Sequence, residues 1–112
     1  MERRRSKRMA VNLNAERISG NERHSIFIED ISESGIHIIS APSQESRKYT
    51  AGADIDVSFR ISQKKSITLH CKTRWAYHRM LPEKQVDSIG LEIISPPAEY
   101  LEFIRTLSRS GV

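Results

Sequence analysis

Two stretches in which apolar and polar residues alternate restrict the fold of this sequence more than any other feature. Residues 54–62, DIDVSFRIS, and residues 66–78, SITLHCKTRWAYH, place an apolar side chain at nearly every second position. Successive side chains of a strand point to opposite faces of a sheet, so a period of two predicts half-buried strands. In the second stretch this parity puts Trp75 on the core face, together with Leu69 and Cys71.

Similar but shorter patterns predict the other strands. The β-branched runs at 24–32 and 35–40 are separated by a short turn that ends in a glycine, which is typical of a hairpin. Serine, proline and charged residues indicate a loop at 40–53, and Pro82 interrupts the pattern at 79–85. Two further strands are expected at residues 10–19 and 86–94.

The C-terminal residues change to a helical period. A helix is predicted over about residues 96–109, with Ser95 as its N-cap and prolines at its start. Its apolar face, at positions i, i+3, i+4 and i+7, consists of Tyr100, Phe103, Ile104 and Leu107. About six strands followed by one helix predict a mainly β fold: a six-stranded antiparallel β-barrel with the helix packed on it. A chain of 112 residues can bury enough surface to form one such domain.

The charge of the chain is concentrated at its N-terminus. The formal net charge is +4, and the first eight residues carry five basic side chains and one acidic one. The other thirteen Lys and Arg residues balance thirteen Asp and Glu residues. We therefore divide the chain into a flexible basic arm, residues 1–10, and a barrel domain without net charge, residues 11–112. A protein that binds nucleic acid through its folded face would distribute basic residues over that face.

Several functional classes lack their sequence signals. The four histidines have no metal-ligand spacing, and Cys71 is the only cysteine, so no zinc site is expected. Nucleophile-elbow, phosphate-loop and dinucleotide-binding motifs do not occur, which argues against an enzyme and against a bound cofactor. Apolar runs are too short for a membrane span. A single cysteine is typical of a reducing compartment, so we expect a cytoplasmic location.

Two motifs remain as candidates for function. Arg4 and Arg8 form R-x-x-x-R in the arm, and Asp30, Ser32 and Gly35 form D-x-S-x-x-G at a turn between strands. Taken singly, an arginine cluster at a terminus is usually a solvated tail, and an Asp, Ser and Gly group between strands is usually turn chemistry.

The two motifs together, in this order on a short β-barrel, resemble the PilZ domain, a family of bacterial receptors for the second messenger cyclic di-GMP. The resemblance extends over nearly the whole chain, including the glycine in SIGLEII, the TRWAYH stretch and the closing helix. It implies a receptor for cyclic di-GMP with a signalling role in motility or biofilm regulation. It also implies that Arg4, Arg8, Asp30, Ser32 and Gly35 belong to the ligand site.

These residue types suit a ligand with two guanines and two phosphates. The arginine guanidinium stacks on flat rings and forms paired hydrogen bonds to phosphate or to a guanine edge. The Asp30 carboxylate can accept hydrogen bonds from the N–H groups of guanine, and the Ser32 hydroxyl can donate or accept. At Gly35, the absence of a Cβ allows a tight turn or a close approach of the ligand.

Three further residues are secondary candidates. Arg3 and Arg5 lie next to the motif positions, and each could reach the second phosphate or stack on a second, intercalated ligand molecule. Trp75 lies late in its strand, near the expected barrel mouth, where some members of the family place an aromatic ring against guanine. The stoichiometry could thus be one ligand or a stacked pair.

Binding is expected to neutralise the arm and to order it over the barrel, which would create a surface for a separate effector protein.

Two alternatives stay open. One is a degenerate PilZ-type adaptor that binds only proteins, and the other is a small barrel that binds single-stranded nucleic acid. A barrel that binds single-stranded nucleic acid needs aromatic and basic residues interleaved on its outward strand positions, and the outward positions of this sequence do not show that pattern. We therefore expect no DNA or RNA partner. Membrane insertion is not expected either, because the apolar runs are too short.

Overall fold

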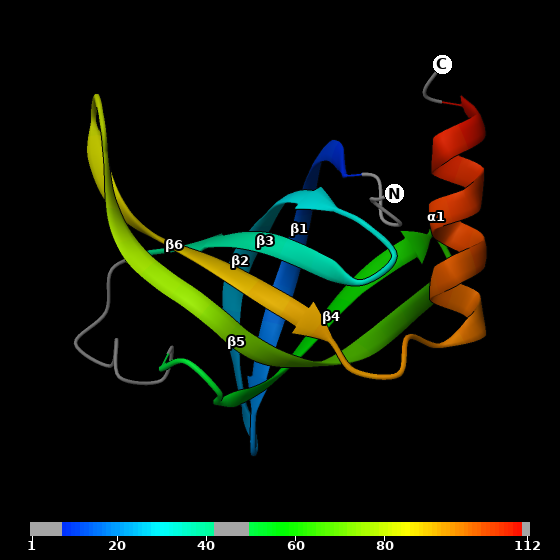
Figure 1. Ribbon diagram of the computed structural model, residues 1–112, viewed down its shortest axis with the longest axis horizontal. Helices are drawn as coiled ribbons and strands as arrows, with labels where there is room; N and C mark the ends of the chain where they lie inside the picture. The colour runs from blue at the N-terminus through cyan, green and yellow to red at the C-terminus, as the bar shows by residue number, and fades with distance from the viewer. Residues whose placement is uncertain (1–7, 42–49, 111–112) are drawn as a thin grey trace, which may run out of the picture.

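The protein forms a six-stranded barrel with one helix beside it (Figure 1). The computed structural model describes residues 8–41 and 50–110, with the backbone alone described at Ser110. The predicted mainly β fold, the antiparallel barrel and the C-terminal helix are confirmed. The elements are β1 (Met9–Ser19), β2 (Glu22–Ile31), β3 (Gly35–Ser40), β4 (Asp54–Ser62), β5 (Lys65–Leu81), β6 (Lys84–Ile93) and α1 (Ala98–Ser110).

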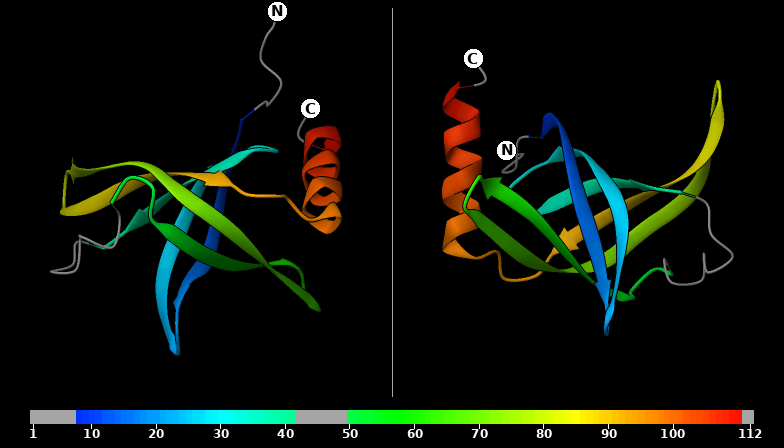
Figure 2. Two further views of the ribbon diagram at one scale, coloured as in Figure 1. Left: turned by 60° about the horizontal axis from the view of Figure 1, so that its bottom comes forward. Right: turned by 180° about the vertical axis from the view of Figure 1, so that it is seen from behind.

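Every strand of the barrel pairs antiparallel with its neighbours, in the order β1-β2-β3-β6-β5-β4. The ring closes where β1 meets β4, over only four residue pairs, Ala15 to Ile18 with Phe59 to Asp56. Figure 2 shows the two strands crossing at this seam. The β1–β2 pairing places Ala10 opposite Asp30, so the start of the first strand lies beside the end of the second.

The core is built mainly from the alternating apolar residues that predicted the strands. Isoleucine dominates it, because β-branched side chains fit the pleated surface of a sheet. Fully buried apolar side chains with no exposed surface are Ile28, Ile31, Ile36, Ile38, Val57, Leu69, Cys71, Ile89 and Tyr100. Cys71 is a free thiol whose pKa burial raises to about 12, so it packs as a small apolar side chain.

The helix α1 packs against the barrel through the predicted apolar face. Tyr100 is fully buried, and its ring meets Phe59 of β4 edge-on at a centroid distance of 6.3 Å. The Tyr100 hydroxyl donates a hydrogen bond of 2.6 Å to the Ser32 carbonyl, which ties the helix to the β2–β3 turn. Burial raises the pKa of the Tyr100 phenol, so the hydroxyl keeps its proton and stays a donor.

The predicted N-cap at Ser95 is wrong. The helix begins at Ala98, and the first backbone hydrogen bonds run from Tyr100 and Leu101 to the Pro97 carbonyl. Ser95 instead has a φ of 51°, in the left-handed region. A residue that precedes a proline is disfavoured in the α region, which keeps Ser95 and Pro96 out of the helix, so that the helix begins only after Pro97.

Strand β5 also differs from the prediction. It continues to Leu81 and joins β6 through a tight turn at Pro82 and Glu83, where a longer interruption was expected. The hairpin curls away from the barrel at the upper left of Figure 1. Its pairing with β6 shifts register between Thr73 and Trp75. This bulge reverses the parity, because one extra residue moves every later side chain to the other face.

The core position expected for Trp75 from its parity is therefore wrong. Thr73, before the bulge, is buried, whereas the Trp75 side chain is 43% exposed and Tyr77 is 53% exposed.

The described part of the chain starts one residue before β1. Since β1 begins at Met9, the last two residues of the predicted arm belong to the barrel. Of the predicted arm, Arg8 is also described, whereas residues 1–7 lie outside the described residues. In the described ranges, no helix has the length and apolar character that crossing a membrane requires.

Candidate functional site

The turn between β2 and β3 is organised by Ser32. Its hydroxyl accepts hydrogen bonds from the backbone N–H groups of Gly35, at 3.1 Å, and Ser34, at 3.3 Å, and donates to the Gly35 carbonyl at 3.2 Å. The Ser32 side chain is buried. The hydroxyl thus holds the turn that follows Asp30, and its predicted direct contact with a ligand stays a prediction.

Gly35 is required by close packing of two strands. A Cβ at this position would lie 2.8 Å from the Leu91 carbonyl oxygen of β6, which is closer than real Cβ contacts allow. The same Cβ would be 3.6 Å from an Arg8 side-chain nitrogen. The glycine therefore allows β3 to approach β6 beneath the arginine.

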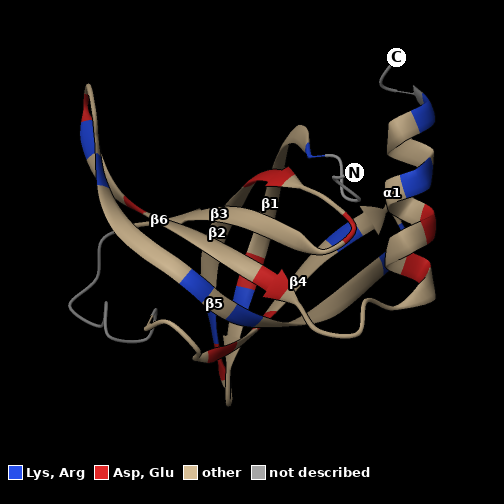
Figure 3. Cartoon of the chain, viewed as in Figure 1, with Lys and Arg blue, Asp and Glu red and all other residues tan. Residues whose placement is uncertain are grey.

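The two sequence motifs meet at an ion pair. Arg8 precedes β1 and Asp30 lies near the end of β2, and the β1–β2 pairing brings them together although they are 22 positions apart. Arg8 Nη1 lies 2.5 Å from Asp30 Oδ1. Their side chains are 53% and 26% exposed, so both remain accessible from solvent. Figure 3 shows acidic residues at the end of β2, close to the start of β1.

His37 joins this pair and was not among the predicted site residues. Its Nδ1 lies 3.4 Å from Asp30 Oδ2, and its Nε2 lies 2.5 Å from the Ser88 hydroxyl of β6. A second carboxylate, from Glu29, is 3.6 Å from the same Nδ1 and pairs with Arg79 of β5 at 3.1 Å. One signal could have found it: His37 is the outward polar residue between the inward Ile36 and Ile38.

Trp75 lies beside His37 and over Gly90. Trp75 and Gly90 are opposite each other in the β5–β6 pairing, and a Cβ on the glycine would lie 2.3–2.5 Å from three atoms of the indole. The indole meets the His37 ring edge-on, with centroids 5.1 Å apart, and Tyr77 follows at 5.3 Å. An aromatic ring thus lies against the backbone of β6 at Gly90.

We refer to Arg8, Asp30, His37, Trp75 and Tyr77 as the outer cluster. They come from the residue before β1 and from β2, β3 and β5, and all lie on the outside of the barrel wall. The cluster offers a cation, a carboxylate, an imidazole and two accessible rings. This combination can contact an anionic ligand that also has flat aromatic groups.

The remaining predicted site residues cannot be placed. Arg3, Arg4 and Arg5 lie outside the described residues. Within residues 8–41 and 50–110, no group of three or more His, Cys, Asp or Glu side chains is arranged to hold a metal ion.

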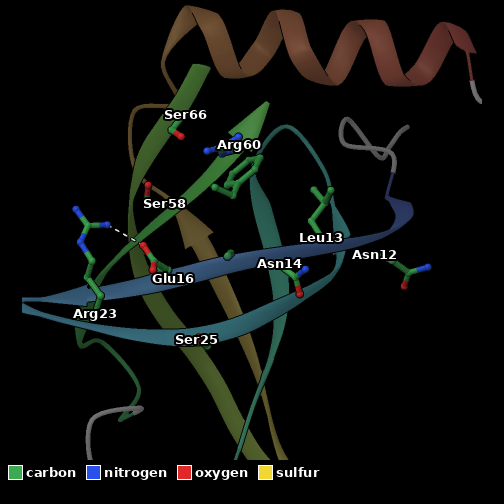
Figure 4. Close-up of a pocket in the computed structure, with 11 residues that line it drawn as sticks. Asn12, Leu13, Asn14, Glu16, Arg23, Ser25, Ser58, Arg60 and Ser66 are labelled. Carbon is green, nitrogen blue, oxygen red and sulfur yellow. Dashed lines mark hydrogen bonds and ion pairs between the residues drawn. The ribbon is translucent and has the colours of Figure 1, made fainter. Parts of the chain in front are cut away.

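A separate groove of about 830 Å³ runs along the β1–β4 seam (Figure 4). Asn12, Asn14, Ser58 and Arg60 contribute to its lining, which also includes an ion pair between Arg23 and Glu16 at 2.8 Å. Of the predicted ligand residues that the structure describes, none lines this groove. We assign the candidate site to the outer cluster, because the charged and aromatic groups converge there.

Comparisons with known proteins agree with the resemblance noted from the sequence. The family model described as PilZ domain matches residues 2–110. A search of curated proteins found none that matches the sequence.

Solved structures share the fold. The inhibitor of motility MotI/DgrA from Bacillus subtilis aligns with a TM-score of 0.79 at 16% identity, over 99% of this chain and 52% of that one. The PilZ domain of YcgR from Escherichia coli, solved with c-di-GMP, aligns with a TM-score of 0.73 at 12% identity, over 98% of this chain and 95% of that one.

The MrkH–c-di-GMP complex of K. pneumonia aligns with a TM-score of 0.72 at 15% identity, over 96% of this chain and 51% of that one. The chain thus spans about half the length of MotI and of MrkH. At these identities the similarity establishes a common fold.

Proposed function

Because this chain belongs to the PilZ domain family, we propose that it is a receptor for cyclic di-GMP that binds the ligand on the outer cluster. The observation that carries the proposal is the contact between Arg8 and Asp30, since it joins the two motifs at one exposed point. The YcgR and MrkH structures with bound c-di-GMP support the choice of ligand.

Each group has a role suited to this ligand. The Arg8 guanidinium binds a phosphate or a guanine edge, and Asp30 accepts from guanine N–H groups. In the structure these two side chains bind each other, so the ligand has to share or replace their ion pair. The exposed faces of Trp75 and Tyr77 provide stacking surface for a base.

The N-terminal arm completes the site in this proposal. Arg4 supplies the second motif guanidinium, and Arg3 and Arg5 bind the second phosphate or a second, intercalated ligand molecule. Ligand binding neutralises the arm and orders it over the barrel, and the new surface is read by a separate effector protein. The receptor acts in the cytoplasm and catalyses no reaction.

The test is isothermal titration of cyclic di-GMP into the protein, with Arg4→Ala/Arg8→Ala and Asp30→Asn as site variants. Arg60→Ala serves as the matched control, because Arg60 is an arginine of the β1–β4 groove that donates to the Gln63 carbonyl, away from the outer cluster. We expect saturable binding in the wild type and the control, and its loss in the double arginine variant.

Absence of binding in the wild type, by calorimetry and by a second method, would refute the receptor function. The chain would then be a PilZ-type barrel that acts as a protein adaptor. Binding that survives intact in Arg4→Ala/Arg8→Ala would refute the assignment of the site.

A further inference from the structure

His37 occupies a connecting position in the outer cluster. Nδ1 faces the Asp30 carboxylate at 3.4 Å, Nε2 faces the Ser88 hydroxyl at 2.5 Å, and the ring edge meets the Trp75 indole. The His37 side chain is only 17% exposed, so its packing fixes the ring in this orientation. It therefore connects the carboxylate side of the site to the aromatic side.

The ring is surrounded by charges that cancel when it is neutral. Of its charged neighbours, Asp30 is paired with Arg8, and Glu29 is paired with Arg79. Two carboxylates and two guanidinium groups add to zero, so a proton on the imidazole gives the group a net charge of +1. The titratable and polar groups that face the ring or its direct partners are Arg8, Glu29, Asp30, Trp75, Tyr77, Arg79 and Ser88.

We propose that His37 positions the Asp30 carboxylate for the ligand and makes the affinity of the site for cyclic di-GMP rise as the pH falls. This inference rests on the proposed function. Histidine is the side chain that changes charge between pH 5 and 8, whereas the two phosphodiesters keep their charge of −2 throughout that range. The dependence on pH must therefore come from the protein.

The size of the effect follows from one added charge. A unit positive charge at about 6 Å from a phosphate, at an effective dielectric constant of about 40–80 for a largely solvated site, strengthens binding about three- to tenfold. Because two carboxylates face Nδ1 and a hydroxyl faces Nε2, we expect Nδ1 to carry a hydrogen in both protonation states. Acidification thus adds attraction without disturbing the position of Asp30.

Trp75 allows the protonation of His37 to be followed without ligand. It is the only tryptophan of the chain, and a cationic imidazole in contact with an indole quenches its emission. The emission of the free protein should decrease between pH 8 and 5.5. His37→Gln keeps a hydrogen-bonding amide but cannot take a charge, so the decrease should disappear in this variant.

His70 provides the matched control. It is an outward histidine of β5 whose Nδ1 lies 2.9 Å from the Asp56 carboxylate, so it resembles His37 in its partner but lies outside the cluster. The experiment measures emission and affinity for cyclic di-GMP at pH 8, 7, 6 and 5.5 in the wild type, His37→Gln and His70→Gln. We expect affinity to rise about three- to tenfold on acidification in the wild type and in His70→Gln, and to stay constant in His37→Gln.

The possible failures are distinguishable. Equal pH dependence of affinity in His37→Gln and the wild type, with binding intact, overturns the role of His37 and leaves the receptor function standing. An emission change that persists in His37→Gln overturns it as well. No binding by the wild type at any of these pH values refutes the proposed function and this inference with it.

Discussion

Gly90→Ala should displace Trp75 from the barrel wall. The added Cβ would lie 2.3–2.5 Å from three indole atoms, and contacts under 3.0 Å do not occur in real structures. The indole is rigid and lies against Gly90 of β6, so the whole ring has to move. Since the Trp75 side chain is already 43% exposed, it can swing into solvent without disrupting the core.

The cost can be worked from the surface that the ring loses. A tryptophan buries up to about 150–250 Å², and about half of that burial is at stake for a ring that is 43% exposed. At about 25 cal/mol per Å² this corresponds to about 2–3 kcal/mol. Replacing glycine by alanine in a strand returns about 0.5–1 kcal/mol, because the unfolded chain loses freedom. The net destabilisation should be about 1–2 kcal/mol, or about 5–10 °C in Tm.

The assay combines thermal unfolding with the emission spectrum of Trp75. Gly90→Ala should lower Tm and shift the emission to the red, since the indole becomes more hydrated. Gly20→Ala is the control: Gly20 has a φ of 61°, and nothing lies within 4 Å of its Cβ position. It should cost about 1 kcal/mol through backbone strain and leave the emission unchanged.

A Gly90→Ala protein with wild-type Tm and wild-type emission would refute this reasoning. A second test is the double variant with Trp75→Ala. If the cost of the alanine comes from the collision with the ring, adding Gly90→Ala to Trp75→Ala should cost nothing further. A cost that persists without the ring would place its origin in the β6 backbone.

Three further predictions concern the barrel and its surface. Tyr100→Phe removes the donor to the buried Ser32 carbonyl and should lower the free energy of unfolding by about 1–3 kcal/mol, measured by denaturant titration. Cys71, whose thiol pKa is raised to about 12, should resist alkylation at pH 8 in the native protein and react after unfolding; fast native reaction would contradict its burial. The Lys72 ammonium, through a hydrogen bond and its charge, lowers the pKa of Asp54. The interaction between Lys72 and Asp54 should stabilise the fold fully above about pH 4, and this stabilisation should be lost as the pH falls through the pKa of Asp54 in the folded protein. Lys72→Met should raise that pKa, which an NMR titration measures.

Much of the fold could be predicted from local patterns. The period of two predicted the strands, and the helical spacing predicted α1 with its buried face at Tyr100 and Ile104. These features depend on which face of each element is buried, and that information is written into the alternation of apolar and polar residues. The start of the helix was missed because two prolines delay it beyond Ser95.

The candidate site was only partly readable from the sequence. The two motifs predicted Arg8 and Asp30, and strand pairing brings them together. His37 was missed because its outward position in β3 does not reveal its partners: these come from β2, β5 and β6, and only the closed barrel places them around one ring. Contacts of this kind join residues that are far apart in the sequence, so a local sequence pattern cannot predict them.

Trp75 separates what the sequence determined from what the tertiary structure decided. The sequence alone determined a strand and an indole whose parity indicated the core. The bulge at Arg74 reversed that parity and turned the indole outward onto Gly90. A bulge arises from the twist and closure of the whole barrel, and one inserted residue exchanges the two faces of a strand. The amino-acid pattern therefore specified the barrel, while the pairing of β5 with β6 decided which side chains form its outer face.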